Sequence, residues 1–210
     1  MIDKIFNGQT VVCLASGPSL TQEQVDQVEY SYLPTIAINN TFKLAPWCDL
    51  VFACDIKWWY KYYEEVIETC WDAELWTIKG VGQHFHKKTK TLGPTINEVG
   101  FTRTLGLGYN DKISHGGNSG YLAVNLAYLM GAKKIILVGY DHQHTDGKTH
   151  WHGDHDKTYF AKNADDTQRW LNNFRILSRA LQNEGIDLVN CSIETAITSC
   201  RRSTLDKELL

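Results

Sequence analysis

Short apolar runs recur along this chain of 210 residues, and each is followed by a stretch with helical character. The clearest runs are residues 10–15 (TVVCLA) and 134–138 (KIILV). Both are too short for buried helices, and both are rich in the β-branched side chains typical of strands. Weaker runs of the same kind occupy residues 35–39, 50–54, 74–78 and 187–190. We therefore predict a buried strand at each of these places.

Helical patterns separate the predicted strands. Ser19 or Thr21 can cap a first helix that continues to Val28. Gly131 has the position of a C-cap glycine after an apolar helix. The remaining predicted helices span residues 56–70, 119–130 and 162–183. Strands that alternate with helices predict a mostly parallel sheet with helices on both faces.

We expect one doubly wound, Rossmann-like α/β domain that spans residues 1–210, because no linker or repeat divides the chain. Residues 80–117 carry many glycines and only weak strand signals, and we expect an irregular insertion or lid there. The net charge of −3 disfavours general attraction to nucleic acid or acidic membranes. No run is apolar enough for a membrane span or signal peptide, so we expect a cytoplasmic protein with reduced thiols.

Five of the eight histidines fall between Gly139 and His155, in the segment GYDHQHTDGKTHWHGDH. This segment begins where the strand at residues 134–138 should end. Loops at the carboxyl ends of parallel strands are where open α/β sheets bind ligands. Histidine beside carboxylate can move protons, contact anions or bind metal. We expect the active site in this loop.

Three other strand ends carry polar or glycine-rich signals. The turn after the first strand is either an anion cradle at a helix N-terminus or an ordinary tight turn. It consists of Ser16, Gly17, Pro18 and Ser19. Asn39 and Asn40 close the second strand, where side-chain amides can contact a base or ribose, or cap a turn. Asp55 ends the third strand and can contact a ribose or a metal, or cap the next helix.

A second candidate cradle precedes the apolar helix at residues 119–130. It combines small residues with an amide and a hydroxyl: Gly117, Asn118, Ser119 and Gly120. A helix N-terminus with such residues favours a bound anion. Two cradles in one domain favour a nucleotide ligand.

The histidine segment allows several interpretations. His150 to His155 match the H-x-H-x-D-H pattern of metallo-β-lactamase-type dizinc hydrolases, but no histidine follows His155 to complete such a site. A single divalent ion, Mg²⁺ or Mn²⁺, is an alternative, with candidate ligands Asp141, His150, His152 and Asp154. In a third interpretation no metal takes part and one histidine acts as general base or acid. The last is a solvated surface loop.

Four segments together resemble the MptE-like family: LASGPSL, AINN, GGNSGYLAVNLAYLMGAKKIILVGYD and VNCSIETAITSCRRSTLDKEL. That family is named for an archaeal hydroxymethylpterin pyrophosphokinase and includes many phage and prophage proteins. The layout is also similar to bacterial sialyltransferases of the Campylobacter type. The chain departs from those enzymes at Ser16, where they carry asparagine. It also has histidines after Asp141, where they have phosphate-binding tyrosines.

The resemblance implies a sialyltransferase-like fold and a nucleotide site. It places Gly17, Pro18 and Ser19 at the phosphates or ribose, and Asn39 at the nucleotide. It places Ser119 and Gly120 at the base or phosphate, and Asp141 at the reaction centre. It also implies a bacterial or phage-infected host cytoplasm.

These observations predict a nucleotide-dependent transferase that moves a glycosyl group from an activated sugar to a hydroxyl. One of His150, His152 and His155 would be the base, and Asp141 would position the acceptor or a metal. An alternative is a Mg²⁺-dependent pyrophosphokinase that uses Asp55, Asp141 or Asp154. Another is a non-catalytic nucleotide-binding phage accessory protein.

The partners follow from the same expectation. The donor is a nucleotide or nucleotide sugar, and the acceptor is a glycan, a small molecule or a modified DNA base. The sequence predicts no cofactor other than an optional divalent metal ion, Mg²⁺ or Mn²⁺. The apolar helix at residues 119–130 and the aromatic cluster at residues 58–63 would each suit an interface between copies of the chain.

Overall fold

The computed structural model describes residues 2–91, 93–144, 147–153 and 164–209. Within these ranges the strands are β1 Thr10–Leu14, β2 Thr35–Ile38, β3 Leu50–Phe52, β4 Glu74–Ile78, β5 Asn97–Thr102, β6 Lys112–Ser114, β7 Lys134–Val138, β8 Asp187–Asn190 and β9 Arg201–Arg202. The helices are α1 Gln22–Ser31, α2 Ile56–Thr69, α3 Val81–Thr89, α4 Ser119–Leu129, α5 Ala164–Asn183 and α6 Leu205–Glu208, with a 3-10 helix η1 at Asn39–Lys43.

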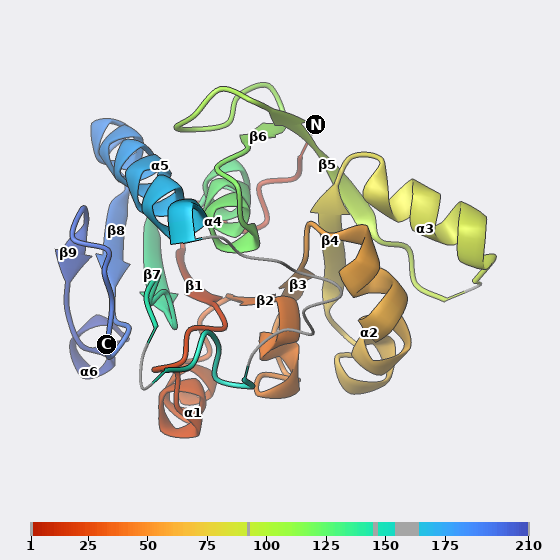
Figure 1. The fold of residues 1–210 in the computed structure, drawn as a ribbon, viewed down its shortest axis with the longest axis horizontal. Helices are drawn as coiled ribbons and strands as arrows, with labels where there is room; N and C mark the ends of the chain where they lie inside the picture. The colour runs from red at the N-terminus through yellow and green to blue at the C-terminus, as the bar shows by residue number, and fades with distance from the viewer. Residues whose placement is uncertain (1, 92, 145–146, 154–163, 210) are drawn as a thin grey trace.

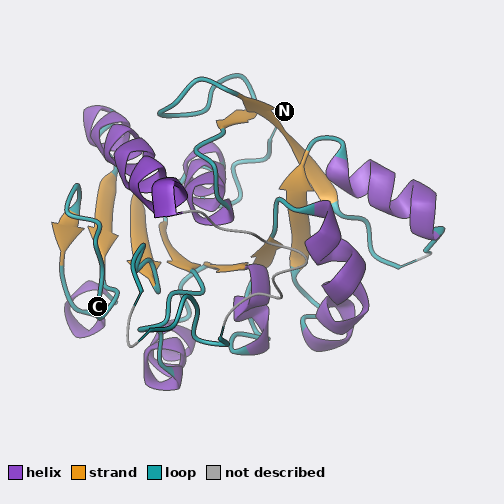
Figure 2. Cartoon of the chain, in the orientation of Figure 1, coloured by secondary structure: helices purple, strands orange, loops and turns teal. Residues whose placement is uncertain are grey.

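The described strands form one sheet in the order β6-β5-β4-β3-β2-β1-β7-β8-β9, and every pair is parallel (Figure 1). The sheet is strongly twisted: in Figure 1 the arrowheads of β7 and β8 point down the page and that of β4 points up, although neighbouring strands are parallel. Figure 2 shows the same sheet with the helices on its two faces. The right-handed twist of strands accumulates in this way across a wide sheet. The predicted α/β, doubly wound, Rossmann-like fold is confirmed.

Side chains of the central strands are buried on both faces of the sheet. In β1, Val11 and Cys13 join one apolar cluster, which includes side chains of α4 and α5. Val12 and Leu14 join the other, which includes side chains of α1, α2, α3 and α6. Each buried valine or leucine stabilises the fold by about 1.5–3 kcal/mol. Helices on both faces therefore explain why the four residues after Thr10 in β1 are all apolar.

Residues 80–117 differ from the irregular insertion that we expected, because they contain α3, β5 and β6 and extend the sheet. Val99 and Ile113 bury their side chains in the core. The connection between β5 and β6 depends on α4, because the Asn125 side-chain oxygen accepts hydrogen bonds from the backbone N–H groups of Gly108 and Ser114. These contacts come from a helix that follows both strands in the sequence, so the local pattern of each strand does not reveal them.

The chain order creates a switch point between β1 and β7. From β1 the chain adds β2 and β3 on one side, and it later adds β7 and β8 on the other. Loops that leave two such strands at their carboxyl ends go to opposite faces of the sheet, so a ligand crevice forms there. None of the helices in the described part of the chain has the length and hydropathy to cross a membrane.

Candidate functional site

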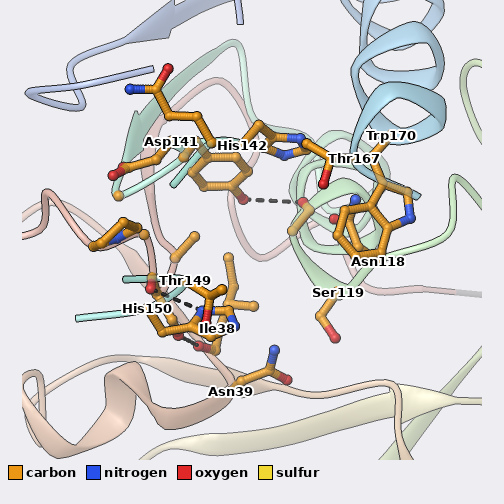
Figure 3. A pocket seen from close by; sticks show the side chains of 18 of the residues that line it. Ile38, Asn39, Asn118, Ser119, Asp141, His142, Thr149, His150, Thr167 and Trp170 are labelled. Carbon is orange, nitrogen blue, oxygen red and sulfur yellow. Dashed lines mark hydrogen bonds between the residues drawn. The ribbon is translucent and has the colours of Figure 1, made fainter. Parts of the chain in front are cut away.

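A cavity of about 430 Å³ lies at this switch point. Its walls come from the segments that follow β1, β2, β3 and β7, and from the starts of α4 and α5 (Figure 3). The predicted site residues that line it are Ser16, Gly17, Pro18, Asn39, Asp55, Gly117, Asn118, Ser119, Gly120, Asp141 and His150. Sequence positions more than a hundred residues apart therefore meet in one cavity.

The N-terminus of α4 forms one wall of the cavity. Asn118 caps the helix by accepting a hydrogen bond from the Tyr121 N–H (2.9 Å). The N–H groups of Ser119 and Gly120 belong to the first turn and have no acceptor within the helix. The side-chain nitrogen Nδ2 of Asn118 is buried and finds no hydrogen-bond partner in the described structure. This wall therefore offers unused donors at the positive end of a helix dipole.

Gly117 leaves room for an aromatic neighbour on the same wall. Its φ of +100° is one that glycine adopts without strain. A Cβ atom there would lie 2.9 Å from the indole Nε1 of Trp170. Trp170, from α5, is half-buried and lines the cavity. The sequence pattern predicts a core position for Trp170, because it shares helical spacing with Phe174 and Leu177, so sequence reasoning missed this wall residue.

The turn after β1 differs, because three of its N–H groups already have acceptors within the protein. The Gly17 N–H donates to the Gly139 carbonyl (2.8 Å), the Ser19 N–H to the Asp141 carboxylate (2.7 Å), and the Leu20 N–H to the Gly17 carbonyl (3.1 Å). Pro18 has no N–H to offer. This turn therefore forms a closed surface of the cavity and presents few donors to an anion.

Asp141 holds that turn in place. Its carboxylate is 1% exposed and accepts hydrogen bonds from both the N–H and the hydroxyl of Ser19 (2.7 and 2.8 Å). A Cβ atom on Gly17 would lie 2.2 Å from the Asp141 carboxylate oxygen, so glycine is required here for close packing. Ser19 itself does not line the cavity, since its polar atoms face Asp141.

The segment after β2 presents only one of its two asparagines to the cavity. Asn39 lines it with φ at +52°, in the left-handed region that asparagine tolerates better than most residues. Asn40 is buried elsewhere, and its side-chain oxygen accepts a hydrogen bond from the Trp58 indole (2.8 Å). Asp55 lines the cavity and caps α2 by accepting from the Lys57 N–H (2.8 Å).

His150 is the histidine of the predicted base set that lines the cavity. Its Nδ1 lies 3.2 Å from the carbonyl oxygen of Ser16, and the same oxygen accepts the Trp151 N–H (3.3 Å). The His152 ring stacks on that of His150 with centroids 5.2 Å apart. His152 does not line the cavity. His155, like Asp154, lies outside the described residues.

His142 is a further cavity residue that sequence reasoning left out of the site. It follows Asp141 with φ at +50°, and its ring packs against Tyr140 and Phe174. A backbone in the left-handed region is costly for histidine, and such conformations concentrate at functional sites. The density of histidines in this loop is the sequence feature that could have indicated His142 as a site residue.

The described residues hold no group of three or more histidine, cysteine, aspartate or glutamate side chains that could bind a metal ion. Asp141, His150 and His152 therefore do not form a three-ligand set, and the Asp141 carboxylate already accepts two hydrogen bonds from Ser19. The fourth candidate ligand, Asp154, is not among the described residues.

Comparison with known proteins finds no match: no model of a known protein family matches the chain, and no curated protein matches it. The resemblance to the MptE-like family therefore stays a prediction.

Proposed function

We propose that this chain is a nucleotide-dependent transferase that moves a glycosyl group from a nucleotide-activated sugar to an acceptor hydroxyl. One observation carries the proposal: a cavity at the topological switch point has an open helix N-terminus on one wall and His150 on another. Figure 3 shows Asn118 and Ser119 on one side, with Thr149 and His150 across from them. Anion binding and proton abstraction thus have separate places in one cavity.

The wall at α4 suits the phosphates of the donor. The leaving nucleoside phosphate gains negative charge as the sugar departs, and donors fixed before the reaction stabilise that charge. The N–H groups of Ser119 and Gly120 and the buried Nδ2 of Asn118 are such donors. Placing the phosphates here also removes the desolvation cost of Nδ2.

His150 suits the role of general base. When Nδ1 carries the proton and donates to the Ser16 carbonyl, the lone pair of the ring is on Nε2. The Ser16 carbonyl thereby selects the tautomer, as an orienting partner does in catalytic triads. Nε2 would take the proton of the acceptor hydroxyl as that oxygen bonds to the anomeric carbon. The bond between this carbon and the phosphate oxygen breaks, and its electron pair leaves with the phosphate.

Asp141 and Ser19 would act as positioning residues. Their two hydrogen bonds hold the turn after β1, and that turn supplies the Ser16 carbonyl that orients His150. The same convergence of the loops after β1, β2 and β7 with the start of α4 supports membership of the MptE-like family, which we propose together with the activity.

The test begins with wild-type protein and a panel of nucleotide sugars, nucleoside diphosphates and nucleoside triphosphates, each with and without Mg²⁺ or Mn²⁺. Thermal shift identifies the donor, and chromatography of the products identifies the bond that breaks. Release of a nucleoside phosphate with sugar transfer supports the proposal. Release of AMP from ATP would instead show diphosphate transfer, and binding without consumption would show an accessory protein.

The role of His150 is tested with His150→Ala. Removing a general base lowers turnover by about 10²- to 10⁴-fold while donor affinity stays within threefold. The matched control is His84→Ala, because His84 is an exposed histidine on α3 outside the cavity. Unchanged turnover in His150→Ala would refute this assignment, and a loss restricted to His152→Ala would move the role to His152.

A further inference from the structure

Cys54, which follows β3, contacts the first residue of α4. The backbone N–H of Cys54 donates to the hydroxyl oxygen of Ser119 (3.4 Å), and the Cys54 sulfur lies 3.1 Å from the same oxygen. Both residues line the cavity, and Ser119 is 8% exposed. Two atoms of one residue therefore converge on the single oxygen of Ser119.

These contacts limit where the Ser119 proton can go. A hydroxyl has one proton and two lone pairs. The Cys54 N–H can only donate, so it uses one lone pair. The contact between sulfur and oxygen allows two polarities, with either the thiol or the hydroxyl as donor. If the thiol donates, both lone pairs of Ser119 are used and its O–H is directed elsewhere.

The thiol has a proton to donate. Burial raises the pKa of Cys54 above the usual value of 9.0, although its hydrogen bond with Ser119 acts in the opposite direction. The negative charge of Asp55 raises this pKa further. Cys54 is therefore a neutral S–H group at physiological pH, and a weak donor rather than a thiolate acceptor.

We propose that Cys54 is a positioning residue that directs the Ser119 O–H toward a phosphate oxygen of the bound nucleotide. This inference rests on the proposed function, because it requires a phosphate at the start of α4. Sulfur is a weak acceptor, whereas hydrogen bonds to phosphate are charge-assisted. A phosphate in the cavity thus selects the polarity in which the thiol donates to Ser119 and Ser119 donates to the ligand.

Cys54 and Ser119 then act on the phosphate through one hydroxyl group, and the loss of either side chain should weaken binding by a different factor. Ser119→Ala removes a donor to a charged group and should weaken binding by about tenfold or more. Cys54→Val keeps the side-chain size but removes the thiol donor, so the hydroxyl loses its fixed direction. Ordering a side chain in advance is worth about a threefold gain in affinity. In a Ser119→Ala background, Cys54→Val should therefore have no further effect.

The experiment measures affinities by isothermal titration calorimetry for ADP, GDP, CDP and UDP, with the matching nucleosides as probes that lack phosphate. Variants are Ser119→Ala, Cys54→Val, their combination, and Cys54→Ser, which restores a donor and should bind within twofold of wild type. Cys200→Ala is the matched control, since Cys200 is a half-buried thiol outside the cavity. Thermal unfolding of each variant shows that the fold is intact.

The inference is supported if Cys54→Val weakens diphosphate binding, leaves nucleoside binding unchanged, and has no effect without the Ser119 hydroxyl. Equal losses in both backgrounds, or equal losses for nucleosides, would overturn it while the proposed function stands. Should Cys54→Val fail to fold, a Cys54→Ser variant with tenfold weaker binding would overturn it equally. If no nucleotide in the panel binds wild type, the proposed function itself fails.

Discussion

The turn after β1 and the start of α4 look alike in sequence and differ in what they can do. Both combine glycine with serine and precede a helix, and both lie on the cavity wall. In the turn after β1 the N–H groups of Gly17, Ser19 and Leu20 all have internal acceptors. At α4, the N–H groups of Ser119 and Gly120 have no acceptor within the helix, and the buried Nδ2 of Asn118 has no hydrogen-bond partner among the described residues. Glycine in a strand-to-helix turn therefore indicates close packing as readily as a ligand.

The largest effect that tests this comparison is expected at Gly17. A Cβ atom would lie 2.4 Å from the Gly139 carbonyl oxygen as well as against Asp141, and backbone cannot move aside. We expect Gly17→Ala to lower the free energy of unfolding by about 3 kcal/mol, at the upper end of overpacking costs. Urea denaturation measures it. Normal stability with a tenfold loss of nucleotide affinity would instead make this turn the phosphate cradle.

An intermediate effect is expected at Asn118, in binding rather than stability. Serine is as good a helix cap as asparagine, so Asn118→Ser should keep the free energy of unfolding within about 0.5 kcal/mol. The substitution removes the buried Nδ2 donor beside the phosphates without burying a charge. Nucleoside diphosphate affinity should then fall by about tenfold or more. Calorimetric titration measures it, and unchanged affinity would place the phosphates elsewhere.

The smallest effect is expected at Ser16. Its hydroxyl lies 3.0 Å from the Thr41 hydroxyl and 3.3 Å from the Ile38 carbonyl, which are internal partners. Ser16→Ala should cost about 1 kcal/mol of stability and leave nucleotide affinity within twofold. Urea denaturation and calorimetry on one protein preparation separate the two. A tenfold loss of affinity would show that the hydroxyl reaches the ligand.

Much of the fold could be predicted because its strands are local apolar runs. The runs at residues 10–15 and 134–138 contain β1 and β7, and Gly131 ends α4 as expected. The additional strands β5 and β6 escaped prediction because their connection is held by Asn125, from a helix that follows both in the sequence. Local patterns carry no trace of such a partner.

The loops that form the candidate site could be predicted from the sequence, but the hydrogen bonds that each of their residues makes could not. Parallel topology alone brings strand ends together, so Gly17, Asn39, Ser119 and Asp141 were found from the sequence. That Asp141 binds Ser19, 122 positions away, was not visible there. The division between used and unused donors depends on such distant pairs.

The hydrogen bonds from Gly17 to Gly139 and from Ser19 to Asp141 have a consequence for changing what the cavity accepts. They join the loops after β1 and β7 across the switch point, so this part of the cavity wall is fixed by Gly17, Ser19, Gly139 and Asp141. Mutant libraries aimed at new donors or acceptors should therefore keep these four residues and vary the other cavity residues of the loop after β7 and of α5, which are residues 142–144, 149, 166, 167 and 170. Substitutions at those four residues are expected to unfold the protein before they change which ligand it selects. Substitutions at the other cavity residues leave these hydrogen bonds intact and can change the selectivity of a folded protein.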